Sequence, residues 1–442
     1  MKLLVVGTGA REHALVHRLR RDVGVTTVIA APGNPGIARL VRSVPVDVTD
    51  PEAIFALAEA ERVDLTVVGP EAPLAAGVAD RFQAGGRLLL GPTRAAAALE
   101  TSKAFAKAFM ARHGVPTARF LDCDAVEEAL AAVARGELGW PLVVKADGLA
   151  AGKGVVIAQD RGEAEAAVRA AMLDKRFGAA GARVVFEECL VGREASFFVL
   201  ADGTRFVTLD SAEDHKRIFD GDRGPNTGGM GAYSPSPLLT PAVRAQVVET
   251  IVRPVIDGMR AEGHPFRGFL YVGLMLTEDG PKVIEFNVRL GDPEAQVVLP
   301  RIETSLWPLL RDAAAGSLDG GLEAVALGSA PHVGVVLAAS GYPDAVRSGD
   351  AISGIDAAEA AGAVVFHAGT AMKDGRLVTS GGRVLTVVAS GADFQSAIDA
   401  AYAAARHISF EGMQLRHDIG ARALGASSRG ASRRATSTEP RR

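Results

Sequence analysis

The sequence predicts a multidomain protein of the α/β and α+β classes that begins with a doubly wound parallel sheet. Strand and helix signals alternate over residues 1 to about 100, which is typical of a parallel sheet covered by helices. Residues 322–420 instead contain short strands with glycine-rich turns, which indicates a small mixed domain. The chain of 442 residues is long enough for about two to four domains.

The apolar periodicity places the elements in order. In the N-terminal part we expect strands at 3–6, 25–30, 65–68 and 87–90, and helices at 12–20, 51–61 and 75–83. In the middle we expect helices at 103–113, 127–135, 163–173 and 240–259, and strands at 142–144, 155–158, 184–190, 195–200, 268–276 and 281–290. The C-terminal part should hold strands at 333–338, 364–367 and 384–389 and one helix at 394–404.

The composition excludes several classes of protein. The net charge is −4 and aromatic residues make up 5%, which disfavours a nucleic-acid surface or an anionic-membrane surface. Cys123 and Cys189 fit neither a disulfide framework nor a zinc site. The apolar run at the N-terminus is too short for a signal peptide or a membrane span, so we expect a cytoplasmic protein.

A glycine-rich hairpin tip separates the apolar runs at 142–144 and 155–158. Glycine lets backbone N–H groups turn toward an anion, and two lysines add positive charge. The stretch carries Lys145, Gly148, Gly152, Lys153 and Gly154. A P-loop is excluded because the glycine spacing is too short and a strand follows. On this stretch alone, a phosphate-binding loop and a mobile hairpin tip with solvated lysines are equally good readings.

The first turn, GTGARE at 7–12, tests for a dinucleotide site. Glu12 stands where the third glycine of the fingerprint belongs, and no acidic residue follows the second strand. A nicotinamide or flavin site is therefore disfavoured. A smaller phosphorylated ligand at the start of the first helix, supported by Arg11 and His13, and an exposed helix cap remain open.

Two further stretches carry polar side chains that suggest binding. Residues 213–235 are poor in apolar residues but lie between strong strands, so we expect a binding loop rather than a disordered linker. In the strand at 281–290, alternation places Glu285, Asn287 and Arg289 on one face together with Val283. The other face would carry Ile284, Phe286 and Val288. Carboxylate, amide and guanidinium groups in a row suit the binding of Mg²⁺ with phosphate. We favour this interpretation over an exposed polar strand face without a function.

Taken together, the motifs resemble the glycinamide ribonucleotide synthetases, phosphoribosylamine–glycine ligases of the ATP-grasp superfamily. The resemblance rests on GTGAREHAL (7–15), APGNPG (31–36), GPEAPL (69–74), KADGLAAGKGV (145–155), DHKR (214–217), GPNTGGMGAYSP (224–235) and EFNVRLGDPEAQ (285–296). It covers residues 1 to about 420 and departs from the family pattern at Leu290 and Ala295.

This resemblance implies an organisation and a reaction. The parts would be an N-terminal substrate-binding α/β domain (1–101), an ATP-grasp domain (102–321) with a small lid lobe at about 118–190, a C-terminal mixed domain (322–420) and a disordered tail (421–442). The enzyme would join glycine to 5-phospho-β-D-ribosylamine through glycyl phosphate, consuming ATP, in de novo purine biosynthesis. It would use Mg²⁺ or Mn²⁺. We expect a monomer rather than an obligate oligomer.

The resemblance also implies roles for individual residues. Lys103 and Lys145 would contact the ATP phosphates, and Glu194 would hold the ribose hydroxyls. The lid loop and the adenine hinge would comprise Gly148, Gly152, Lys153, Gly154, Glu187, Glu188 and Leu190. Glu285 and Asn287 would be the metal ligands. Arg289 would be the cation at the transferred phosphate. Asp214 and Lys216 would lie near glycine and the amine. Other substrate-binding candidates are Gly9, Arg11, Glu12, His13, Asn34, Asn226, Gly291 and Asp292.

Three alternatives remain at this point. The first is another ATP-dependent ligase of purine synthesis that acts on a different carboxylate. The second is an oxidoreductase with a dinucleotide-binding sheet, which the first turn disfavours. The third is a nucleotide-binding module without activity, against which the intact polar strand and both lysines argue.

Overall fold

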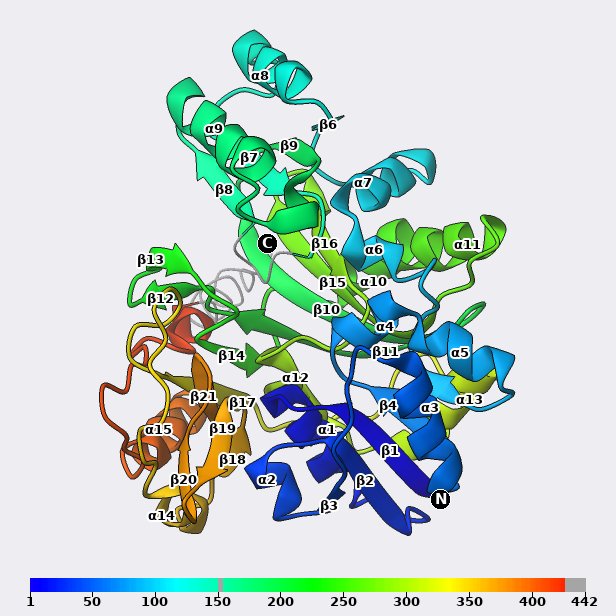
Figure 1. Cartoon of the computed structure of the whole chain (residues 1–442), viewed down its shortest axis with the longest axis vertical. Helices are drawn as coiled ribbons and strands as arrows, with labels where there is room; N and C mark the ends of the chain where they lie inside the picture. The colour runs from blue at the N-terminus through cyan, green and yellow to red at the C-terminus, as the bar shows by residue number, and fades with distance from the viewer. Residues whose placement is uncertain (150–153, 426–442) are drawn as a thin grey trace, which may run out of the picture.

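A computed structural model describes residues 1–149 and 154–425 of the protein. The N-terminal part forms a five-stranded parallel sheet in the order β3-β2-β1-β4-β5 (Figure 1). Its elements are β1 (Lys2–Gly7), α1 (Ala10–Leu19), β2 (Thr27–Pro32), α2 (Pro35–Ala38), β3 (Arg42–Ser43), α3 (Pro51–Ala60), β4 (Leu65–Val68), α4 (Glu71–Ala76), α5 (Val78–Ala84) and β5 (Leu89–Leu90). This confirms the predicted doubly wound sheet. The helix expected at 75–83 is divided at Gly77, whose φ of +90° is left-handed.

A small lobe stands at the top of Figure 1, apart from the body of the molecule. The chain reaches it through α6 (Ala98–Thr101) and α7 (Lys103–Arg112). Its elements are β6 (Phe120–Cys123), α8 (Val126–Arg135), β7 (Leu142–Ala146), β8 (Val155–Ala158), α9 (Arg161–Val168), the π-helix η1 (Arg169–Leu173), the 3₁₀ turn η2 (Gly178–Gly181) and β9 (Val184–Glu188). The strands form an antiparallel sheet in the order β6-β9-β7-β8, and the lobe has a hydrophobic core of its own. The predicted hairpin is therefore the β7–β8 pair.

An eight-stranded antiparallel sheet joins the middle of the chain to its C-terminal part. Its order is β16-β15-β10-β11-β14-β17-β21-β18. The strands are β10 (Arg193–Asp202), β11 (Phe206–Asp214), β14 (Gly231–Ser234), β15 (Arg267–Thr277), β16 (Gly280–Asn287), β17 (His332–Ala338), β18 (Val364–His367) and β21 (Arg383–Ser390). The pairing of β14 with β17 makes the sheet continuous. Side chains of the N-terminal sheet and of β10 and β15 share hydrophobic clusters, so these parts pack as one body.

The polar segment 213–235 differs from the expected binding loop, because much of it is paired strand. It contains a hairpin of β12 (Arg217–Phe219) and β13 (Arg223–Asn226), followed by β14. Glycines and charged residues, which are rare in strands, hid these strands in the sequence. One partner of β14, the strand β17, also lies about a hundred residues further along the chain.

A bulge in β16 corrects the predicted alternation. Gly273 pairs with Glu285 whereas Leu274 pairs with Val283, so Ile284 is an extra residue. As a result Val283 is buried in the same hydrophobic cluster as Phe286, and it does not share the polar face of Glu285.

The remaining helices cover the large sheet. They are α10 (Pro241–Val247), η3 (Val248–Val252), α11 (Arg253–Ala261), α12 (Glu294–Val298), η4 (Leu299–Arg301), α13 (Leu306–Ala315), α14 (Ile355–Ala360) and α15 (Phe394–Ala405). The C-terminal part also holds the hairpin of β19 (Thr370–Lys373) and β20 (Arg376–Thr379). The sequence reading missed α14 and this hairpin. Residues 421–425 are helical, although we expected the tail to begin at 421. None of the helices in the described ranges is long and apolar enough to cross a membrane.

Candidate functional site

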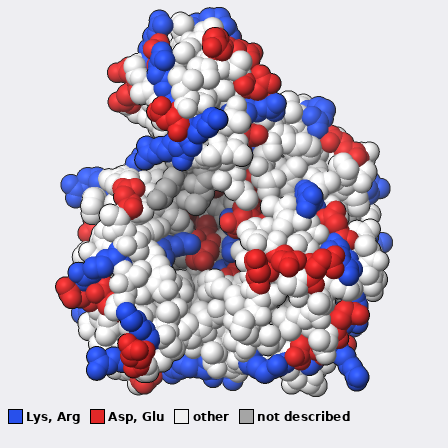
Figure 2. Space-filling view, in the orientation of Figure 1, with Lys and Arg blue, Asp and Glu red and all other residues white. Residues whose placement is uncertain are grey.

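A hollow opens beneath the small lobe, and both acidic and basic side chains lie within it (Figure 2). Charged residues predicted for the ATP site and for the substrate site lie close enough together to shift the pKa of Asp214. The carboxylates of Glu194, Glu285 and Glu294 all raise the pKa of Asp214, while Lys216 lowers it. The structure thus brings together side chains from β10, β11, β16 and α12, which lie up to a hundred residues apart in the chain.

A lysine–glutamate–lysine cluster is buried in the site. Nζ of Lys145, at the end of β7, lies 2.7 Å from Oε1 of Glu187, and Nζ of Lys107, on α7, lies 2.9 Å from its Oε2. Lys145 also donates to the carbonyl of Ile284 (3.2 Å), and Lys107 to Oγ1 of Thr117 (2.7 Å). Burial lowers the pKa of Lys107 to about 8, against the opposing pull of Glu187. Burial raises the pKa of Glu187, but the two ammonium groups outweigh it and hold that pKa below its usual value.

Lys103 lies beside Asp147 and Gly148, where the predicted lid loop begins after β7. Its Nζ donates to the carbonyl of Gly148 (3.0 Å). Asp147 accepts from the backbone N–H of Ala104 (2.7 Å) and from the hydroxyl of Ser102, which ties the loop to the start of α7. Gly154 closes the stem, because its carbonyl accepts from Ala146 (2.8 Å). The predicted loop residues Gly152 and Lys153 lie outside the described residues.

The predicted hinge residues have different surroundings. Glu187 faces the two lysines, as described. Glu188 binds Arg119, which donates through Nε at 2.7 Å and through its backbone N–H at 3.0 Å. Leu190 is half-buried just after β9. The sequence reading did not anticipate the side-chain partners of these glutamates.

Glu194, Lys216 and Asp214 form a second cluster of charged side chains. Nζ of Lys216 lies 2.9 Å from Oε2 of Glu194. Burial by itself lowers the pKa of Lys216, but Glu194 and Asp214 together raise it well above its ordinary value. Burial raises the pKa of Asp214 to about 7, and neighbouring carboxylates add to this effect. Asp214 therefore exchanges a proton near neutral pH, which is what a general base requires.

Glu285 and Asn287 project from the end of β16. Within 1–149 and 154–425, neither side chain makes a hydrogen bond or an ion pair, whereas the neighbouring Arg289 is strongly held. Arg289 contacts Glu71 (3.1 Å) and Glu100 (2.8 Å) and donates to the carbonyl of Leu290 (3.1 Å). In the described part of the chain no group of three or more His, Cys, Asp or Glu side chains could hold a metal ion.

The residues predicted around the first turn fall into two sets. Gly9 and Arg11 lie against the loop of Gly291 and Asp292, whereas Glu12, His13 and Asn34 bind other parts of the protein. Arg11 donates to the carbonyl of Leu290 (3.1 Å), which brings the turn against the loop that carries Gly291 and Asp292. A Cβ added to Gly9 would lie 3.4 Å from Oδ2 of Asp292, so these loops are in contact.

The second set is buried and already bound to protein. The carboxylate of Glu12 accepts from the backbone of Gly9 and pairs with Arg11 (2.6 Å). Nδ1 of His13 accepts from the backbone of His367 (2.9 Å), and burial holds the pKa of His13 well below its usual value. Asn34 caps α2 and donates to the carbonyls of Thr8 and His367. Asn226 lies in β13 opposite Arg217, within the hairpin.

Several residues of the site escaped the sequence reading. Lys107 follows Lys103 by one helical turn, and this spacing was the available signal. Glu294 is buried at the start of α12, where burial raises its pKa, and it follows directly in the GDPE motif. Arg383 comes from β21 of the C-terminal part and donates to the carbonyl of Asp292 (2.6 Å). Nothing local in the sequence marks Arg383.

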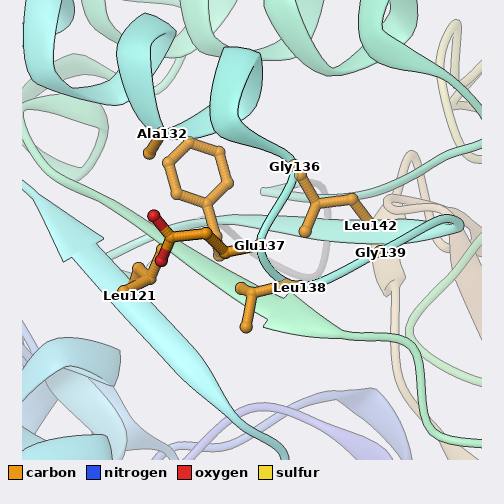
Figure 3. A pocket seen from close by; sticks show the side chains of 8 residues that line it. Leu121, Ala132, Gly136, Glu137, Leu138, Gly139 and Leu142 are labelled. Atoms are coloured by element: carbon orange, nitrogen blue, oxygen red, sulfur yellow. The ribbon is translucent and has the colours of Figure 1, made fainter.

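A separate cavity lies inside the small lobe, away from these charges (Figure 3). It is lined by Leu121, Ala132, Gly136, Glu137, Leu138, Gly139, Leu142 and Phe186. Its volume of about 10 Å³ is comparable to a single water molecule, so it is too small for a substrate.

The fold and the site define an ATP-grasp enzyme, an ATP-dependent ligase. The family models of phosphoribosylglycinamide synthetase match in order: the N domain at residues 1–100, the ATP-grasp (A) domain at 101–295 and the C domain at 332–422. The chain belongs to the phosphoribosylglycinamide synthetase family.

Relatives and solved structures agree with this assignment. The chain is 53% identical to a phosphoribosylamine–glycine ligase of Ralstonia nicotianae, over 96% of this chain and 100% of the relative. It is 48% identical to the enzyme of that name from Vibrio parahaemolyticus, over 96% and 99%. A crystal structure of phosphoribosylamine–glycine ligase from Thermotoga maritima superposes with a TM-score of 0.83 at 34% identity, covering 95% of this chain and 100% of that one. A biotin carboxylase from Campylobacter jejuni shares the fold, with a TM-score of 0.69 at 16% identity.

Proposed function

We propose that the chain catalyses the ATP-dependent ligation of glycine to 5-phospho-β-D-ribosylamine, giving glycinamide ribonucleotide, ADP and phosphate in de novo purine biosynthesis. The observation that carries this proposal is the full-length match to relatives of that activity. Two features support it: Lys145 and Lys107 share the buried carboxylate of Glu187, and Asp214 and Lys216 interact with Glu194 and Glu285. An oxidoreductase is disfavoured, since Glu12 fills the space beside Gly7 and Gly69 that a dinucleotide fingerprint leaves to glycine.

The first step is phosphoryl transfer, which depends on positioning and charge neutralisation. A carboxylate oxygen of glycine attacks the γ-phosphorus of ATP, the bond to ADP breaks, and glycyl phosphate forms. We propose that Lys103 and Lys145 hold the ATP phosphates, with Lys107 and Glu187 fixing Lys145. Glu194 would bind the ribose hydroxyls, and the backbone around Glu188 and Leu190 would meet the adenine. The lid loop, with Gly148, Gly152, Lys153 and Gly154, would exclude water that hydrolyses the acyl phosphate.

The second step forms the amide. The nitrogen of phosphoribosylamine attacks the acyl carbon, loses a proton, and the C–O bond to phosphate breaks. We propose that Asp214 accepts this proton, because its pKa of about 7 leaves it partly ionised at neutral pH. Lys216 would bind a carboxylate or phosphate oxygen of the reacting group. Arg289 keeps further N–H groups beyond its bonds to Glu71 and Glu100, and these would stabilise the charge on phosphate.

The donor set of β16 fits a divalent cation. Glu285 and Asn287 supply two oxygen ligands that no described residue occupies, and Mg²⁺ typically takes one or two protein oxygens with water and phosphate. We propose that these residues hold Mg²⁺ or Mn²⁺. The ion would offset the negative charge of the phosphates.

The amine substrate would lie between the first turn and the loop after β16. We propose that Gly9, Arg11, Gly291, Asp292 and, from the hairpin, Asn226 face its phosphoribosyl end. The bonds of Glu12, His13 and Asn34 suit these residues to holding the loops. The division into parts at 1–101, 102–321 and 322–420 is proposed with this assignment, while a monomeric state and a cytoplasmic location stay predictions from the sequence.

ADP release by the purified full-length protein tests the proposal. We expect ADP release that requires both glycine and freshly prepared phosphoribosylamine, and a product with the mass of glycinamide ribonucleotide. Release with another carboxylic acid but none with glycine would assign the chain to a different ligase.

A further inference from the structure

The last residues of the described chain, from Arg416 onward, bind the hairpin β12–β13 through several hydrogen bonds. We name residues 416–422 the C-terminal clasp; its segment, coloured red in Figure 1, lies beside this hairpin. The side chain of Arg416 is 0% exposed. Its guanidinium donates to both oxygens of Asp418 (2.7 Å each), to the carboxylate of Asp222 (2.9 Å) and to the carbonyl of Arg217 (3.0 Å). A guanidinium this deeply buried is tolerated only when it is fully paired.

Further contacts interleave the clasp with the hairpin turn. The backbone N–H of His417 donates to Asp220 (2.7 Å), and that of Gly221 donates to Asp418 (2.9 Å). Arg422 binds Asp222 through a second ion pair. Asp222 has a left-handed φ of +56°, a conformation that favours glycine, so its two arginine partners explain an aspartate at this position.

The clasp is also fixed to the C-terminal domain. The hydroxyl of Tyr402, on α15, donates to the carbonyl of Arg416 (2.8 Å) and accepts from the backbone of Ile419 (3.0 Å). Ile419 is buried against Gly231, where an added Cβ would lie 2.8 Å from its side chain. Tyr402 therefore ties the clasp to this domain, and Ile419 packs the clasp against β14.

The segment 214–217 interacts with charged residues of the candidate site and also with the clasp. Asp214 and Lys216 interact with Glu194 and Glu285 of the hollow. His215 is buried on the other side, where Arg422 and Arg416 lower its pKa further after burial has done so. The clasp holds both ends of this segment through the backbone, because NH1 of Arg422 donates to the carbonyl of Asp214 (3.3 Å).

We propose that the C-terminal clasp is a positioning device for Asp214 and Lys216. Through it the C-terminal domain sets the affinity for the non-nucleotide substrates. Arg416 and Arg422 donate to backbone carbonyls of this segment, so we regard them as positioning residues. This proposal rests on the proposed function above.

The test compares Arg422→Met and Arg422→Lys with the wild-type full-length enzyme. Loss of a bond from a charged donor should raise the KM for glycine or phosphoribosylamine about tenfold or more in Arg422→Met. The KM for ATP should rise by a smaller factor, because Lys216 also pairs with Glu194, the proposed ribose ligand. Arg422→Lys should recover part of the loss because its ammonium keeps the charge. The matched control is Arg347→Met, since Arg347 pairs with two carboxylates of the same domain, Asp350 and Glu411, that do not belong to the hairpin.

A second variant, Asp222→Gly, keeps the left-handed backbone and removes both ion pairs. It should show the same selective rise in KM. Unchanged KM values in either folded variant, or an equal rise for ATP, would overturn the proposal. If the wild-type protein releases no ADP with these substrates, the proposed function fails instead, and the two failures are distinguished in this way.

Discussion

Replacing Asp214 by asparagine should remove the acid limb of the pH–rate profile. The pKa of Asp214 is about 7, against an ordinary value of 3.8, which corresponds to about 4 kcal/mol disfavouring the carboxylate. As a base it must be ionised, so kcat/KM should fall about tenfold per pH unit below about pH 7. In Asp214→Asn, kcat/KM should drop by about a hundredfold or more and lose this limb.

Two neighbouring variants should move the limb in opposite directions. Lys216 lowers the pKa of Asp214, so Lys216→Met should shift the limb to higher pH. Glu294 raises that pKa, so Glu294→Gln should shift the limb to lower pH. The assay is kcat/KM for phosphoribosylamine from about pH 6 to about pH 9, with short incubations. The control is Asp257→Asn, an exposed carboxylate of α11. The reasoning would be refuted if the acid limb of the pH–rate profile remained in Asp214→Asn. It would also be refuted if the limb failed to shift in either Lys216→Met or Glu294→Gln.

Three further variants test other parts of the site. Glu187→Gln leaves two buried ammonium groups without their carboxylate, so it should destabilise the lid lobe by about 3 kcal/mol or more and raise the KM for ATP; an unchanged melting curve would contradict this. Glu285→Ala should abolish turnover while circular dichroism stays that of the wild type, and full activity would exclude the metal assignment. Gly69→Ala places a Cβ 2.0 Å from the carboxylate of Glu12, so thermal unfolding should shift to lower temperature, whereas a neutral result would mean that the first turn moves freely.

Features with a strong local signal could be predicted from the sequence. The β7–β8 hairpin followed from two apolar runs around glycines, and the parallel sheet followed from alternating strand and helix patterns. The approach of Lys103 to the lid loop was expected only as part of a nucleotide site. In each case the determining residues are close together in the chain.

Features set by distant contacts could not be predicted. The bulge at Ile284 depends on how β15 pairs with β16, and it moved Val283 into the core. The pairing of β14 with β17 turned an expected loop into sheet. From the C-terminal domain, Arg383 reaches the loop of Asp292 and Arg416 reaches the β12–β13 hairpin. A single sequence carries no local sign of such contacts.

The central claim is that the carboxylate of glycine is phosphorylated before the amide forms. Glycine labelled with ¹⁸O at both carboxylate oxygens tests this claim directly. The oxygen that attacks the γ-phosphorus stays with phosphate when the amine displaces it, so the account predicts one ¹⁸O atom in each inorganic phosphate and one in the product amide. Unlabelled phosphate, released at the same rate as the amide product, would contradict the account.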